Sequence, residues 1–146
     1  MIGVVVLLAL TVQCVVGAAT PSGWKVLNGH SYGFIGDQKT WNDAQKSCRS
    51  YGAELVEINN AEEDQFVVAT LKALKQGNSW IGGAASLPGK KFEWVTSHRT
   101  VDCQRYVNWN AAEPNNAGGS EWCLEIRDIG WNDHDCNTRN SFVCEK

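Results

Sequence analysis

Apolar residues recur every three or four positions in two segments of the chain, and this is the spacing of one face of an α-helix. The first predicted helix covers residues 40–51. Thr40 and Asp43 form a capping-box pattern at its start, and Gly52 follows its end. Its apolar face is formed by Trp41, Ala44, Cys48 and Tyr51.

A second helix is predicted for residues 60–76, with Asn60 as its N-cap and Gly77 after its last turn. Acidic residues occupy its first turn and lysines its last, which complements the helix dipole. The first-turn acids are Glu62, Glu63 and Asp64. The predicted buried stripe consists of Phe66, Val67, Thr70, Leu71 and Leu74.

The remaining pattern predicts short strands separated by loops. Residues 24–27 and 32–35 form a predicted hairpin around Asn28-Gly29, and residues 122–126 alternate between apolar and polar like a half-buried strand. Further extended pieces are predicted at 53–58, 80–81, 92–95 and 142–144. Two helices followed by a run of strands predict an α+β fold. Segment 88–120 is largely irregular, and a loop this long in a compact domain usually has a function.

The amino-terminal residues do not belong to this pattern. Residues 2–19 are almost entirely apolar and end in small residues, which is typical of a secretory signal peptide cleaved near Ala19. A retained membrane anchor is the alternative, but the run is marginal for spanning and lacks a basic flank. We therefore expect a signal peptide at 1–19 and one secreted, extracellular domain at 20–146, without membrane insertion.

The charge balance narrows the choice of partners. The chain has 13 basic and 16 acidic residues, a mild acidity that leaves no electrostatic footprint for nucleic acid. No nucleic-acid partner is expected.

Cysteine usage fits an exported domain. Cys14 leaves with the signal peptide, and the remaining five should form two disulfides and leave one thiol over. Spacing alone does not choose the pairs. Joining Cys48 to Cys144 would close the longest loop, whereas joining Cys123 to Cys136 would clamp the segment between them.

Five hard oxygen donors lie close together near the carboxyl terminus. They are Glu113, Asn115, Glu121, Asn132 and Asp133. Calcium takes six to eight such oxygens and tolerates irregular geometry, and an Asn amide can also donate a hydrogen bond to a hydroxylated ligand. Each piece alone is compatible with ordinary turn chemistry in a Gly-rich loop. Together, and with a cysteine near each group, they form a more specific set.

With these motifs the chain resembles a C-type lectin domain, in particular the small secreted invertebrate lectins of perlucin type. The resemblance covers about residues 21–146. It rests on Pro21-Ser22-Gly23-Trp24, the helix ending at Cys48, Glu54-Leu55, Trp80-Ile81-Gly82-Gly83, Glu113-Pro114-Asn115, Glu121-Trp122-Cys123, Trp131-Asn132-Asp133, Cys136 and Phe142-Val143-Cys144.

The resemblance implies a double-looped α+β fold with both termini on one sheet, and the disulfides Cys48–Cys144 and Cys123–Cys136. It also implies a principal calcium site, with a cis peptide bond before Pro114. The ligands would be Glu113, Asn115, Glu121, Asn132 and Asp133, the last also through its backbone carbonyl. The same five residues would bind the sugar. Relatives with a second calcium site carry acids where this chain has Asn116 and Trp122, so one Ca²⁺ is expected.

The resemblance further implies which sugars bind. The order Glu-Pro-Asn suits the equatorial 3- and 4-hydroxyls of mannose, glucose, N-acetylglucosamine and, in an equivalent arrangement, fucose, whereas Gln-Pro-Asp in relatives favours galactose. Trp109 and Asn116 lie in the same segment and are further candidates for touching the sugar. For Trp109 a structural role is favoured, because most of the seven tryptophans are needed to fill the core.

Cys103 is then the odd thiol. It is either a buried or capped free cysteine or the source of an intermolecular disulfide that makes a homodimer. The three histidines, His30, His98 and His134, lack metal-ligand spacing and are expected to be solvated.

The main hypothesis is a secreted, calcium-dependent lectin of mannose-type specificity that is not an enzyme. Its glycan partners would be microbial or cell-surface sugars, and its expected role is recognition or agglutination in innate immunity. The alternative is an extracellular matrix or protein-binding module that keeps the fold without using sugar. A glycosidase would need paired catalytic acids that the sequence does not offer.

Overall fold

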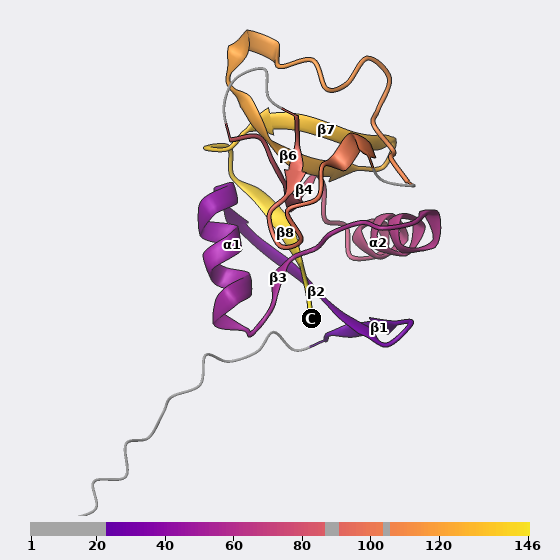
Figure 1. The fold of residues 1–146 in the computed structure, drawn as a ribbon. Helices are drawn as coiled ribbons and strands as arrows, with labels where there is room; N and C mark the ends of the chain where they lie inside the picture. The colour runs from indigo at the N-terminus through magenta and orange to yellow at the C-terminus, as the bar shows by residue number, and fades with distance from the viewer. Residues whose placement is uncertain (1–22, 87–90, 104–105) are drawn as a thin grey trace, which may run out of the picture.

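Two helices flank a mixed β-sheet, with a long loop region at one end of the molecule (Figure 1). The computed structural model describes residues 23–86, 91–103 and 106–146, so the predicted signal peptide lies outside the described residues. The strands are β1 (Lys25–Leu27), β2 (His30–Lys39), β3 (Glu54–Leu55), β4 (Ser79–Ala84), β5 (Glu93–Trp94), β6 (Glu121–Arg127), β7 (Gly130–Asp135) and β8 (Asn140–Glu145). The helices are α1 (Trp41–Ser50) and α2 (Ala61–Ala73), with short 3-10 turns η1 (Val101–Cys103) and η2 (Ala117–Gly119).

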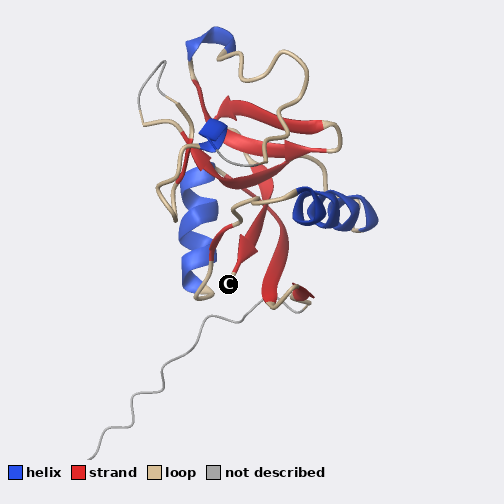
Figure 2. Ribbon diagram, turned by 45° about the vertical axis from the view of Figure 1, so that its right-hand side comes forward, coloured by secondary structure: helices blue, strands red, loops and turns tan. Residues whose placement is uncertain are grey.

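The strand order across the sheet is β1-β2-β8-β4-β6-β7, with β3 beside β8 and β5 beside β4. All pairs are antiparallel except β4 with β8. Figure 2 shows the strands together in one sheet and the two helices outside it, which confirms the predicted α+β class.

The two ends of the domain meet at β1, β2 and β8. The predicted hairpin is present, and both Asn28 (φ 50°) and Gly29 (φ 87°) adopt the positive φ that a tight hairpin turn needs. Strand β2 continues to Lys39, further than the sequence pattern predicted, and pairs with β8. The ammonium of Lys146 lies 4.2 Å from the centre of the Trp24 ring. Both termini of the described domain therefore share one sheet.

Helix α1 begins and packs as its sequence predicts. The Thr40 hydroxyl accepts a hydrogen bond from the Asp43 backbone N–H, and Trp41, Ala44 and Cys48 are buried. The Cys48–Cys144 disulfide joins this buried face to β8. One apolar cluster of the core therefore lies between α1 and the sheet.

Helix α2 is shorter than predicted. Asn60 caps it through the Glu63 N–H, but the helix ends at Ala73. Leu74 is the C-cap and is 47% exposed, so its predicted place in the buried stripe is wrong. The Leu74 backbone is still αR and its N–H donates to the Thr70 carbonyl at 3.0 Å, so helical spacing by itself does not decide burial at the end of the helix.

Two acids in the first turn of α2 are buried as well as being well placed for the dipole. Glu63 accepts hydrogen bonds from the Tyr32 hydroxyl and the Asn59 N–H, each at 2.7 Å. Asp64 accepts from Trp131 Nε1 at 2.7 Å, and burial raises the pKa of its carboxyl. Because buried carboxylates need such partners, these bonds fix α2 to β2 and β7.

Aromatic packing supports the long loop region. The Trp131 ring makes edge contacts with Trp94, Tyr106 and Trp109, at centroid distances of 5.5, 5.8 and 6.1 Å. Trp109 also packs edge-on against Phe92, which supports a structural role for it. None of the described helices is long and apolar enough to cross a membrane.

Candidate functional site

The five predicted ligand residues come from one loop and one hairpin. Glu113 and Asn115 lie on the loop before η2, Glu121 is the first residue of β6, and Asn132 and Asp133 lie in β7. The sequence pattern did not predict β7 as a strand, although its pairing with β6 is what brings the second half of the site alongside the first. In Figure 1 the orange loop passes over the end of the molecule that contains this hairpin.

Asp133 anchors the loop to β7. Its Oδ1 accepts from the Asn115 N–H at 3.1 Å, and its Oδ2 accepts from the Asn116 N–H at 2.8 Å. The Glu113–Pro114 peptide bond is cis, as the resemblance implied. One carboxylate thus holds two successive backbone groups of the loop.

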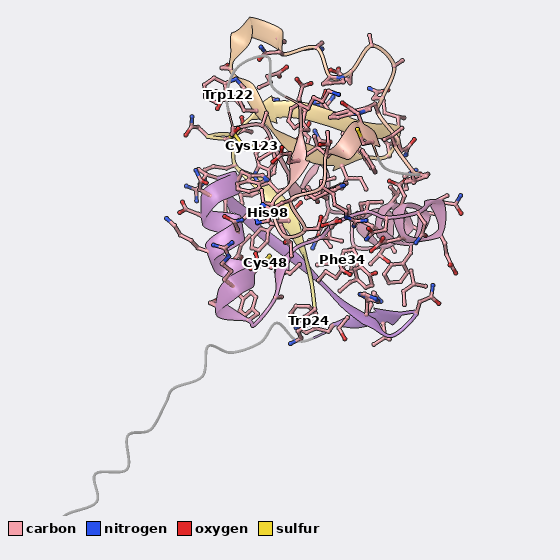
Figure 3. All side chains as sticks on the ribbon, viewed as in Figure 1. Trp24, Phe34, Cys48, His98, Trp122 and Cys123 are labelled. Carbon is pink, nitrogen blue, oxygen red and sulfur yellow. A yellow bond between two sulfur atoms is a disulfide. The ribbon has the colours of Figure 1, made fainter. Side chains whose placement is uncertain are left out.

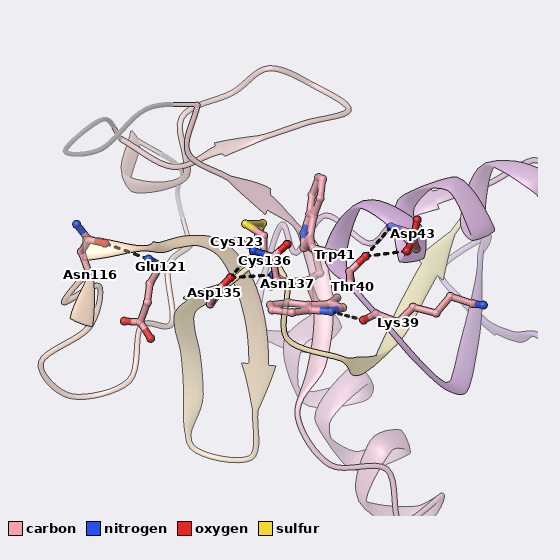
Figure 4. Close-up of a disulfide and its surroundings, with 12 residues drawn as sticks. Lys39, Thr40, Trp41, Asp43, Asn116, Glu121, Cys123, Asp135, Cys136 and Asn137 are labelled. Atoms are coloured by element: carbon pink, nitrogen blue, oxygen red, sulfur yellow. Dashed lines mark hydrogen bonds between the residues drawn. A yellow bond between two sulfur atoms is a disulfide. The ribbon is translucent and has the colours of Figure 1, made fainter. Parts of the chain in front are cut away.

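The side chains of Asn115 and Glu121 converge on a single donor. Asn115 Oδ1 and Glu121 Oε2 each accept from the Ala117 N–H at 2.7 Å, so the two oxygens are close neighbours. Asn116 adopts a left-handed conformation (φ 47°, ψ 48°), which Asn tolerates well. Its Oδ1 accepts from the Glu121 N–H at 3.1 Å (Figure 4).

The Cys123–Cys136 disulfide lies next to this part of the site (Figure 4). It joins the start of β6 to the residue after β7, and the β6–β7 register shifts between Glu121 and Cys123. The Trp41 N–H donates to the Cys136 carbonyl at 3.0 Å, which ties the same turn to α1. Both disulfides that the resemblance implied are present in the structure.

Asn132 is hydrogen-bonded to Glu125, a residue that the sequence pattern did not identify as part of the site. Its Nδ2 donates to Glu125 Oε1 at 3.1 Å and to the Asp133 carbonyl at 2.6 Å. Glu125 looked like a solvent-facing acid in an alternating strand, yet its side chain is fully buried. Only the pairing of β6 with β7, which sets Glu125 opposite Asn132, reveals this contact.

The electrostatics of the site fit a bound cation. Glu113 Oε2 is buried and has no hydrogen-bond partner. Burial, followed by the neighbouring carboxylates of Asp133 and Glu121, raises the pKa of Glu113. A positive ion would satisfy the unpartnered oxygen and offset the repulsion among the three acids. The donor set, three carboxylates and two amide oxygens, is the kind that calcium prefers.

Acidic and histidine side chains alone would not make the site. Among the described residues, no three or more His, Cys, Asp or Glu side chains gather closely enough to hold a metal ion. A cation here would therefore depend on the oxygens of Asn115 and Asn132 as well as on the acids.

Two of the histidines that were expected to be solvated have carboxylate partners. His134 is partly exposed, and its Nδ1 lies 3.3 Å from Glu121 Oε1, so this histidine is only partly solvated and contacts a predicted ligand residue. His30 also has a partner, with its Nδ1 2.7 Å from Glu145 Oε1. Both contacts join residues on different strands, which the local sequence could not reveal.

Cys103 is exposed and forms no disulfide within the chain, which excludes the buried form of the free thiol; a capped thiol and an intermolecular disulfide both stay predictions. Trp122 is partly exposed on β6, next to Glu121 in sequence (Figure 3). Neither Trp122 nor Asn116 offers a carboxylate. A single calcium site stays a prediction.

Comparison with known proteins identifies the family. The model for the lectin C-type domain matches residues 37–146. CD209 antigen-like protein A of Mus musculus is 38% identical over 127 residues, which cover 86% of this chain and 51% of the relative. A C-type lectin mannose-binding isoform of Oxyuranus scutellatus is 35% identical over 135 residues, covering 86% of this chain and 82% of the relative. The chain spans about half the length, or less, of the first curated relatives it matches.

Solved structures agree on the fold. The carbohydrate-recognition domain of the mouse scavenger receptor C-type lectin is 32% identical, with a TM-score of 0.75 over 86% of this chain and 94% of that chain. The type II antifreeze protein of herring is 33% identical, with a TM-score of 0.73 over 86% and 97%. The fold alone therefore does not decide what is bound. By the extent of the family match and the similarity to full-length relatives, the chain belongs to the C-type lectin family.

Proposed function

We propose that the protein is a calcium-dependent lectin that binds mannose-type sugars at the site formed by Glu113, Asn115, Glu121, Asn132 and Asp133. The observation that carries the proposal is the unpartnered, buried Glu113 Oε2 beside the Asp133 carboxylate. A cluster of acids with an unsatisfied oxygen is costly unless a cation completes it.

The five residues would divide the work of binding. Oxygens of Glu113, Asn115, Glu121, Asn132 and Asp133 would hold the cation. When bound, calcium supplies a positive charge and open coordination positions for two adjacent sugar hydroxyls. The carboxylates accept hydrogen bonds from those hydroxyls, and the Asn115 amide donates to them. The Asn132 amide already donates to Glu125 and to the Asp133 carbonyl, so Asn132 would contribute through its oxygen on the cation. The three carboxylates of the site are all assigned to the cation, and C-type lectins are generally not enzymes, so binding without turnover is proposed.

The order of groups in Glu113-Pro114-Asn115 supports a preference for equatorial 3- and 4-hydroxyls, as on mannose and N-acetylglucosamine. The Oxyuranus scutellatus relative is named as mannose-binding, and it agrees with this preference.

Retention on immobilised mannose tests the proposal. The protein should bind mannose-agarose in calcium, elute with EDTA, and be displaced by free mannose at lower concentration than by galactose. The reason is that sugar binding requires both the cation and a pair of equatorial 3- and 4-hydroxyls. Retention that survives EDTA, or that galactose displaces more readily, would contradict the proposal.

Acid should weaken binding at a higher pH than an ordinary carboxylate would predict. The pKa of Glu113 is raised by burial and by Asp133, above the ordinary value of 4.5. Protons compete with the cation for that carboxylate, so affinity is retained at neutral pH and lost as pH falls through the raised pKa. Calcium titrations between pH 7.5 and about 4.5 check this. A calcium affinity that does not change over that range would contradict it.

Export and dimerisation through Cys103 are proposed with the lectin function. One shallow sugar site gives roughly millimolar affinity, whereas linked sites gain about 10²–10⁴. Protein from eukaryotic culture medium should begin near Thr20 and run as a dimer on non-reducing gels, a band that Cys103→Ser removes. Protein that stays inside the cells would contradict export. Protein that runs only as a monomer would contradict dimerisation.

A module that does not use sugar remains the second candidate, because the herring antifreeze protein shares the fold. A glycan array with and without calcium separates the two. Calcium-dependent signals on mannose-type glycans favour the lectin, and an empty array in both conditions favours the alternative.

A further inference from the structure

Glu125 gathers side-chain donors from four places in the chain onto one buried carboxylate. Its Oε1 accepts from Asn132 Nδ2 at 3.1 Å and Asn78 Nδ2 at 3.3 Å, and its Oε2 accepts from Asn140 Nδ2 at 2.7 Å. The Arg127 guanidinium completes the group, with Nη2 at 2.5 Å and Nε at 2.6 Å from Oε1. The Glu125 side chain is 0% exposed.

These donors fix the orientation of the Glu125 carboxylate. A fully buried carboxylate is tolerated only when charge and hydrogen bonds are satisfied, and here Arg127 balances the charge while the amides supply donors. Displacing any donor would leave a buried oxygen with fewer partners, so the network resists local rearrangement.

The network decides which way the Asn132 amide faces. An amide presents two N–H donors on one atom and an acceptor oxygen on the other. Asn132 Nδ2 donates to Glu125 and to the Asp133 carbonyl, and neither acceptor could bond the oxygen instead. The Oδ1 of Asn132 must therefore point away from Glu125.

We propose that Glu125 is a positioning residue that holds Asn132 Oδ1 in the orientation needed to bind calcium before the ion arrives. The inference rests on the proposed function of the site. A hydrogen bond from the amide to a carboxylate also polarises the amide and makes its oxygen a better ligand. Outer partners of this kind typically change metal affinity by about 10–100-fold.

Three variants separate positioning from simple fold stability. Glu125→Leu removes the acceptor, Glu125→Gln keeps an acceptor opposite Asn132, and Asn140→Ala removes a donor to the same carboxylate without touching Asn132. Glu125→Leu should weaken calcium binding by about 10–100-fold, Glu125→Gln should recover most of that loss, and Asn140→Ala should stay within about threefold of wild type. Sugar affinity of Glu125→Leu should return at saturating calcium.

The readouts are the calcium Kd by titration calorimetry and the unfolding midpoint of each variant in EDTA. Equal loss of calcium affinity in Glu125→Leu and Asn140→Ala would overturn the proposal, because it would mean that the network acts only through stability. If the wild-type protein itself binds no calcium, the proposed function is wrong.

A measurement on the wild type keeps the inference testable if Glu125→Leu does not fold. In calcium-free protein, ¹⁵N NMR should show the Asn132 side-chain amide already rigid, with both protons slow to exchange. A freely reorienting amide that becomes ordered only when calcium is added would overturn the proposal.

Discussion

Asp133→Asn should abolish calcium-dependent retention on mannose and lower calcium affinity at least about 100-fold, since loss of an outer partner alone costs about 10–100-fold. The Asp133 carboxylate accepts from the N–H groups of Asn115 and Asn116 while also serving as a proposed ligand. An amide in its place has one acceptor oxygen, and its NH₂ would face a backbone donor. The variant therefore loses a negative charge and also releases the loop. Calcium titration calorimetry measures the effect.

Asp135→Asn is the matched control. Asp135 is the last residue of the same strand, and its Oδ1 accepts from the Asn137 N–H at 2.9 Å rather than from the ligand loop. The substitution makes the same change in charge two residues away, on a partly exposed side chain that is not a proposed ligand. Its charge acts on the site mainly through solvent of high dielectric constant, so calcium affinity should stay within about threefold of wild type. Similar losses in both variants would mean that net charge, and not the Asp133 geometry, governs binding.

Removing the Cys48–Cys144 disulfide should lower the free energy of unfolding by about 4–5 kcal/mol, the larger of the two disulfide effects. This bridge spans 96 residues, whereas Cys123–Cys136 spans 13 and should contribute about 3 kcal/mol. The difference arises because a longer closed loop removes more freedom from the unfolded chain. Paired Cys→Ala variants, unfolded in urea under otherwise equal conditions, measure both values.

For ligand binding, removal of the short disulfide should have the larger effect. Cys123–Cys136 lies at the β6–β7 end that carries Glu121, so its removal should weaken sugar binding under native conditions. Cys48–Cys144 joins α1 to β8, away from the ligand loop, and its removal should leave the calcium Kd of the folded protein nearly unchanged. A larger loss of stability from the short bridge would contradict the loop-length argument.

Local sequence rules predicted much of the fold. The caps at Thr40 and Asn60 and the turn at Asn28-Gly29 depend on neighbours within a few residues, and all three are where the pattern placed them. The lectin resemblance added the two disulfide pairs and the cis bond before Pro114. It also named the five ligand candidates, which the structure brings onto one loop and one hairpin.

What the sequence could not reveal depends on distant partners. The burial of Glu63 requires the Tyr32 hydroxyl, 31 residues away, and the burial of Glu125 requires Asn132, Asn140 and Arg127. The exposure of Leu74 could not be predicted, because helical spacing places residue 74 on the same face as Leu71 whether or not another segment covers the last turn. In each case tertiary contact, not local pattern, decides the environment of the side chain.

A crystal structure grown with calcium and methyl α-mannoside tests the central claim most directly. One calcium ion should be bound by Glu113, Asn115, Glu121, Asn132 and Asp133, with two adjacent sugar hydroxyls completing its shell. A sugar bound elsewhere, or at this site without the ion, would contradict the account.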